Sequence, residues 1–141
     1  MDYYYTAPDD AAALSARDLP GGPMPGSVFA SAEAKDVLAC PHLEQLVGLA
    51  SGMVGENLVP QLKTLWPKPE SFEPGTMITR LPETLRDDLA EMEMTPAIAE
   101  NWAAQLWGFE PDHAAAVGMD IIRIARSGRD AGQPLYWWSE M

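Results

Sequence analysis

The sequence is poor in the residues from which disulfides and zinc sites are built. Among 141 residues it has a single cysteine, Cys40, and two histidines. One cysteine forms no disulfide within the chain. Cys40, His42 and Glu44 lie close together, but a structural zinc site takes four ligands at characteristic spacings. We therefore expect no metal site and no cofactor.

Positive charge is also scarce. Nine Lys and Arg stand against 21 Asp and Glu, which gives a formal net charge of −12. From Leu81 to Asp120 nine carboxylates are accompanied by the single base Arg86. Nucleic-acid binding depends on a patch of Lys and Arg that neutralises phosphates. The charge balance therefore argues against a nucleic-acid partner and favours a basic protein partner.

Long apolar runs are lacking as well. No stretch approaches the roughly 18 residues that a membrane-spanning helix needs. The start MDYYYTAPDD has no basic residue before Arg17, unlike a secretory leader. We expect a cytoplasmic protein with no membrane partner. A hydrophobic content of 47% suits one packed domain over residues 1–141.

Proline and glycine are abundant, with 13 and 11 residues, and they divide the chain into short elements. Aromatic and β-branched residues predict strands at 2–6, 76–81 and 135–138. Proline is favoured in the first turn of a helix, with Ser or Thr as the cap before it. Helices are therefore expected to begin at Pro8, Pro41, Pro82, Pro96 and Pro111, with a further helix at 32–39 capped by Ser31.

Gly128 is expected to end the last helix, and residues 20–26 and 66–75 are expected to form loops. Residues 54–65 stay ambiguous, because Pro60 interrupts both a helix and a strand. This order of elements predicts an α+β fold, with a small sheet of about three strands covered on one face by five or six helices. The N- and C-terminal strands are expected to be neighbours, because both are aromatic and domain termini tend to lie close together.

The opening YYYTAPDDAAAL, the central ETLRDDLA and the closing LYWW resemble a group of small acidic proteins from high-GC actinobacteria. The resemblance runs over most of the chain. No activity is attached to that group, so the resemblance implies no functional residues. Functional expectations therefore rest on the residues alone.

Glu83, Asp87 and Glu91 follow one another at intervals of four and form a stripe on one face of the predicted helix. Like charges at this spacing cost a helix about 0.2–0.5 kcal/mol per pair. A solvated acidic face explains the stripe as well as a docking surface for a cationic partner does. Both interpretations stay open.

Trp102 and Trp107 lie five residues apart and do not share one helical face. If Trp102 is in the core, Trp107 lies at an edge, where an exposed tryptophan is typical of a protein interface. We expect a non-enzymatic interaction module, such as an immunity-type inhibitor of a basic toxin. Its partner is expected to contact Glu83, Asp87, Glu91 and Trp107.

Two further interpretations remain. One is a small ligand-binding domain or enzyme with an aromatic pocket between sheet and helices, lined by Tyr3, Tyr5 and Trp137, with Arg80 and His113 as polar anchors. The other is a homodimer, in which the last helix of one copy meets the acidic helix of a second copy. The arginines of that helix are Arg123, Arg126 and Arg129.

Overall fold

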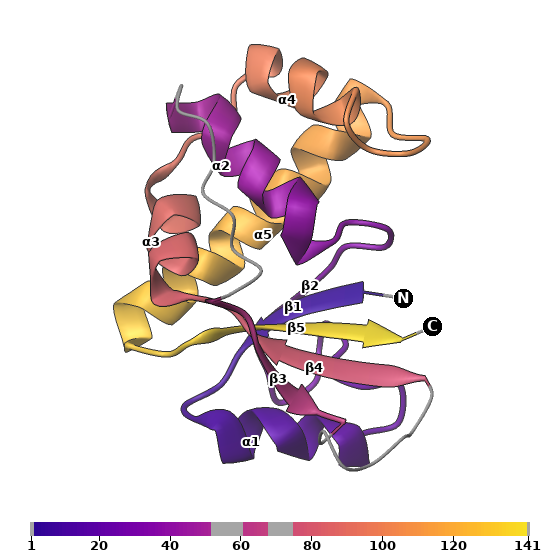
Figure 1. Cartoon of the computed structure of the whole chain (residues 1–141), viewed down its shortest axis with the longest axis vertical. Coiled ribbons are helices and arrows are strands. Elements are labelled where there is room, and N and C mark those ends of the chain that lie inside the picture. Colours follow the sequence, from indigo (N-terminus) through magenta and orange to yellow (C-terminus); the bar gives the residue numbers. More distant parts are fainter. Residues whose placement is uncertain (1, 52–60, 68–74, 141) are drawn as a thin grey trace.

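An antiparallel sheet of five strands forms the middle of the protein (Figure 1). The computed structural model describes residues 2–51, 61–67 and 75–140, apart from the side chain of Cys40. The strand order is β2-β1-β5-β4-β3. The strands are β1 (Asp2–Thr6), β2 (Ser31–Glu33), β3 (Lys63–Trp66), β4 (Thr76–Arg80) and β5 (Leu135–Glu140). The predicted α+β class is confirmed, whereas the expected number of about three strands was too low.

The terminal strands β1 and β5 are neighbours at the centre of the sheet, as the sequence predicted. Tyr4 lies opposite Trp137 and Tyr5 lies opposite Tyr136, with the rings of Tyr5 and Tyr136 5.6 Å apart. Cross-strand aromatic pairs of this kind stabilise an antiparallel sheet. The aromatic content of the two strands therefore serves their pairing with each other.

The two edge strands were not predicted. The expected helix over 32–39 was wrong, because Ser31 lies opposite Tyr5 in β2 instead of capping a helix. β3 falls where the sequence was ambiguous or predicted a loop, and residues 54–60 and 68–74 lie outside the described part. Strands of three or four residues carry little pattern of their own, since pairing with a neighbour decides their conformation.

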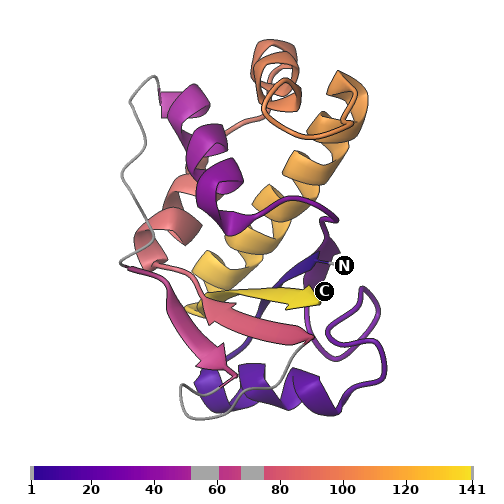
Figure 2. The same cartoon turned by 45° about the vertical axis from the view of Figure 1, so that its right-hand side comes forward.

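Helices cover both faces of the sheet. One face carries the short π-helical turn η2 (Ala39–Leu43), α2 (Glu44–Ser51), α3 (Glu83–Glu91), α4 (Pro96–Ala103) and α5 (Pro111–Ala131). The opposite face carries α1 (Asp10–Leu14), which continues into the 3-10 turn η1 (Ser15–Asp18). Figures 1 and 2 show α1 below the sheet and the other helices above it. The expectation that helices cover one face only was therefore wrong.

Side-chain alternation along β1 and β5 divides the aromatic residues between the two faces. Tyr4 and Trp137 point toward α2–α5, where their rings stack at 6.3 Å. The smaller core, between the sheet and α1, contains Tyr3, Tyr5, Tyr136 and Trp138. Because both faces are covered, the adjacent Trp137 and Trp138 are both buried.

Helix starts follow the predicted chemistry with small shifts. The Thr95 hydroxyl accepts a hydrogen bond from the backbone N–H of Ile98 at 3.2 Å, which confirms the cap before Pro96. Helix α1 is capped by Asp9 and not opened by Pro8, since Asp9 Oδ1 accepts from the N–H of Ala12 at 2.8 Å. A carboxylate that binds this orphan donor makes the stronger start.

Gly128 does not end α5, which continues to Ala131. A Cβ atom at Gly128 would lie 2.7 Å from Cγ2 of Thr6 in β1 and 3.0 Å from the carbonyl oxygen of Gln133. The missing side chain therefore lets α5 pack closely against the sheet.

We expect Gly128→Ala to lower the free energy of unfolding by about 1 kcal/mol, because overpacking outweighs the better helix propensity of alanine. Urea denaturation measures the change. The matched control is Ser127→Ala, at an exposed position of the same helix. A Gly128→Ala protein as stable as the wild type would show that the backbones are not in close contact.

Candidate interaction surface

Trp107 is the most exposed large hydrophobic side chain among the described residues, at 91%. It lies in the turn between α4 and α5. The turn is tight, since Gln105 N–H donates to the Trp102 carbonyl at 2.9 Å and Leu106 N–H to the Ala103 carbonyl at 3.1 Å. Leu106 is buried, so its neighbour Trp107 is directed to solvent.

The chain leaves this turn through Gly108, whose φ of +73° lies in the left-handed region that favours glycine. Phe109 then packs against the main core, and its ring lies 4.6 Å from the ring of His113. The tip of the turn is therefore held by apolar contacts on both sides of Trp107 and Gly108.

Trp102 occupies the opposite environment, as its spacing from Trp107 predicted. It is fully buried between α4 and α5, and its indole N–H donates to the carbonyl oxygen of His42 at 2.9 Å. One tryptophan thus stabilises the helical layer, whereas the other contributes its side chain to the surface.

Carboxylates flank Trp107 on both sides along the chain. Glu100 is exposed on α4, and Glu110 and Asp112 are exposed where α5 begins. Among the described residues no Lys or Arg lies within ion-pair distance of these three carboxylates. We refer to Glu100, Trp107, Glu110 and Asp112 as the α4–α5 end.

The acidic stripe on α3 is partly neutralised by the protein's own arginines. Arg80 Nη2 lies 3.7 Å from Glu83 Oε1, and Arg86 Nε lies 2.9 Å from Asp87 Oδ1. Glu91 is exposed at the end of the helix. Two of the three carboxylates predicted to bind a partner therefore already have a cation beside them.

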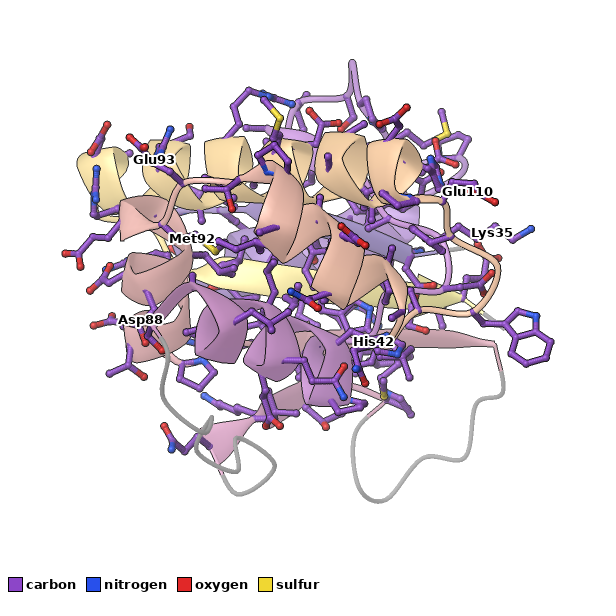
Figure 3. The ribbon with its side chains drawn as sticks, turned by 90° about the horizontal axis from the view of Figure 1, so that it is seen from above. Lys35, His42, Asp88, Met92, Glu93 and Glu110 are labelled. Atoms are coloured by element: carbon purple, nitrogen blue, oxygen red, sulfur yellow. The ribbon has the colours of Figure 1, made fainter. Side chains whose placement is uncertain are left out.

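The structure does not bring this stripe together with Trp107. In Figure 3, Asp88 of α3 and Glu110 at the start of α5 lie at opposite ends of the view, with Lys35 on the side of Glu110. Sequence reasoning placed Trp107 with α3 and missed Glu110 and Asp112 as its neighbours. The signal was present, because only a short turn separates them from Trp107 in the chain.

The residues predicted to line a pocket are distributed over the molecule. Tyr3 and Tyr5 belong to the core between the sheet and α1, whereas Trp137 belongs to the core on the other face of the sheet. His113 is exposed in the first turn of α5. Arg80 donates to Asp10 at 3.0 Å on the α1 side. These five residues therefore do not face one common space.

Asp10 fastens α1 to the sheet through both carboxylate oxygens. Oδ1 accepts from Tyr136 Oη at 2.8 Å and from Arg80 Nη1 at 3.0 Å, and Oδ2 accepts from Lys63 Nζ at 3.0 Å. Burial acts to raise the pKa of Asp10, but the hydrogen bonds from Lys63, Tyr136 and Arg80 outweigh it and hold the pKa below its usual value. A carboxylate held ionised in this way links secondary-structure elements through its hydrogen bonds and is a weak proton acceptor.

Burial raises the pKa of Tyr136 well above its usual value, and the carboxylate of Asp10 adds to the shift. The hydroxyl therefore remains a neutral donor across the ordinary pH range. Together with Tyr5, whose hydroxyl donates to the Ala13 carbonyl at 2.9 Å, it fixes α1 to the sheet. The sheet face that α1 covers is thus joined to the helix by a hydrogen bond from each of these tyrosines.

The arginines at the end of α5 are engaged within the chain. Arg126 Nε donates to the carbonyl of Ala90 and Nη2 donates to that of Met92, both at 2.8 Å, and so satisfies the C-terminal carbonyls of α3. Arg123 lies 3.3 Å from Asp120, and Arg129 lies 3.4 Å from Asp130. These contacts leave the three arginines little unpaired positive charge for the predicted homodimer interface.

His42 takes part in a local contact at the start of α2. Its Nδ1 accepts from the N–H of Leu38 at 2.9 Å, and burial lowers its pKa. Both observations favour the neutral ring. Among the described residues no three His, Cys, Asp or Glu side chains form a group suited to hold a metal ion.

In the described part of the chain no helix is both long and apolar enough to cross a membrane. The resemblance to acidic actinobacterial proteins stays a prediction. No protein-family model, curated protein or solved structure matches this chain.

Proposed function

We propose that this chain is a non-enzymatic, acidic interaction module that binds a basic protein, in the manner of an immunity-type inhibitor. The observation that carries the proposal is the separation of charge along the fold. From Asp87 to Ile122 the sequence has eight carboxylates and no Lys or Arg. These residues form the C-terminal half of α3, all of α4, the α4–α5 turn and the first half of α5, and both α3 and α4 pack against α5 in the helical layer.

A concentration of one sign of charge raises the rate at which an oppositely charged partner is encountered. Two acidic surfaces are available for such an encounter. One is the α3 stripe of Glu83, Asp87 and Glu91, and the other is the α4–α5 end with Trp107. The alternative of an aromatic ligand pocket has weaker support, since Tyr3 and Tyr5 lie on the opposite face of the sheet from Trp137.

The test begins with capture of partners on the full chain in cell extract, followed by purification of each partner and measurement of its association rate. We expect a partner with a pI above about 9, whose association rate falls at least about tenfold between about 20 mM and 500 mM salt. Electrostatic steering is screened by salt, which gives this dependence its physical basis.

The control carries the same kind of charge reversal, at two exposed positions away from both acidic surfaces, with Asp18→Lys and Glu33→Lys. It is expected to slow association less than reversal of Glu100, Glu110 and Asp112 to lysine, although the net charge of the two proteins differs by only one substitution. Captured partners that are all acidic, or association rates that do not respond to salt, would contradict the proposal.

A further inference from the structure

We infer that the basic partner docks on the α4–α5 end and that the indole of Trp107 is the central anchor, inserted into a recess bordered by Lys and Arg. This inference rests on the proposed function. It adds the surface that is used and the chemistry of the site that receives it.

The exposure of Trp107 favours this surface. Its 91% exposed indole contrasts with the remaining described tryptophans, since Trp102, Trp137 and Trp138 are buried and Trp66 is half-buried. An aromatic side chain buries about 150–250 Å² when it is covered. Tryptophan is also among the residues most enriched at the energetic centre of interfaces. Covering Trp107 therefore offers a partner more apolar area than any other single exposed side chain described.

The backbone of the turn that carries Trp107 is already fixed. Leu106 is 6% exposed, and Phe109 packs against the core on the other side of the turn. The backbone hydrogen bonds of Gln105 and Leu106 fix the turn before any partner arrives. Binding through a preformed turn loses less conformational entropy than binding through a mobile one.

The two acidic surfaces differ in whether their carboxylates already pair with arginines of the chain. A partner that approaches α3 has to compete with Arg80 for Glu83 and with Arg86 for Asp87. At the α4–α5 end, Glu100, Glu110 and Asp112 have no such pairs among the described residues. Cations bordering the recess would pair with these carboxylates and lie over the face of the indole. Charge complementarity therefore favours the α4–α5 end.

The same charges distinguish a basic protein from a second copy of the chain. Two copies each carry a formal charge of −12, so bringing their acidic ends together is repulsive. The arginines of α5 that would relieve the repulsion cap α3 or pair with Asp120 and Asp130. A basic protein is therefore the occupant that the surface fits.

The experiment places the photo-crosslinking residue p-benzoylphenylalanine at position 107 of the full chain in its own cells. We expect one dominant adduct with a basic protein, which is lost when Glu100, Glu110 and Asp112 are changed to lysine. With that protein purified, Trp107→Ala should weaken binding about 30-fold or more, as for an interface anchor. Val28→Ala is the matched control, because Val28 is 85% exposed in a different loop, and it should leave the affinity unchanged.

If a basic partner binds Trp107→Ala as tightly as the wild type but is lost on reversal of Glu83, Asp87 and Glu91, the docking site is α3. The inference is then overturned while the proposed function stands. If position 107 crosslinks only to a second copy or to acidic proteins, the inference is overturned as well. If no basic protein binds the wild-type chain at all, the proposed function fails with it.

Discussion

The alanine variant Trp102→Ala is expected to lose about 3–5 kcal/mol of the free energy of unfolding. Trp102 is fully buried, and its ring lies close to Gly118 on α5, where an added Cβ would be 3.1 Å from it. The variant leaves a large cavity between α4 and α5 and removes the donor to the carbonyl of His42. Both effects destabilise the folded protein, because the helical layer loses the contacts of a large, fully buried side chain.

Trp107→Ala is the matched control for this experiment, because the same substitution is made five residues away at a position that is 91% exposed. Its free energy of unfolding should stay within about 0.5 kcal/mol of the wild type. Denaturant unfolding followed by far-UV circular dichroism measures both variants on one scale. Equal losses for the two substitutions would contradict the placement of Trp102 in the core and Trp107 at the surface.

The second large effect is expected for Asp10→Ala, with a loss of about 2–3 kcal/mol. The substitution leaves the buried hydroxyl of Tyr136 without its acceptor and removes the shorter of the two ion pairs of Arg80. Lys63 is largely exposed, and water replaces its contact at little cost. Because Asp10 joins α1 to β3, β4 and β5, the loss should appear in the cooperative unfolding of the whole sheet.

The effect of Asp10 also depends on pH with a definite sign. The pKa of Asp10 is lowered in the folded protein, so the unfolded chain takes up the proton first as the pH falls. The stabilisation is present above the ordinary carboxyl pKa of the unfolded chain and is lost as the pH falls through the lower folded value. The difference in stability between the wild type and Asp10→Ala should therefore be full at neutral pH and shrink in acid.

A double-mutant cycle with Tyr136→Phe separates the hydrogen bond from other effects. The two substitutions should be non-additive, because either one removes the contact between Asp10 Oδ1 and Tyr136 Oη. Asp18→Ala, at an exposed carboxylate of η1, serves as the control and should be close to neutral. Strict additivity of Asp10→Ala and Tyr136→Phe would show that the carboxylate does not bind the tyrosine in solution.

Elements with strong local signals could be predicted from the sequence, and elements defined by distant contacts could not. Aromatic and β-branched runs identified β1, β4 and β5, and the Thr95-Pro96 pair identified the start of α4. The edge strands depend on a neighbouring backbone for their conformation. Helix α1 has only five residues, and its place under the sheet is fixed by residues far along the chain, among them Lys63 and Tyr136.

The candidate surface was predictable to the same extent. Helical spacing was enough to separate Trp107 from Trp102, because the period of one helix fixes which side chains share a face. The relation of Trp107 to α3 is tertiary, and the sequence pattern contains no information about it. The pairs Arg80–Glu83 and Arg86–Asp87 are local and readable in the chain, but their geometry depends on how each arginine is held.

The central position of β1 and β5 in the sheet has a consequence for synthesis. Trp137 on β5 donates its indole N–H to Asp2 on β1, a contact across 135 positions of the chain. While a ribosome is still making α3, α4 and α5, β1 has no β5 to pair with, and the two halves of the sheet remain separate. The middle of the sheet can therefore close only after β5 has emerged, so the two halves of the sheet join after α3, α4 and α5 have been made.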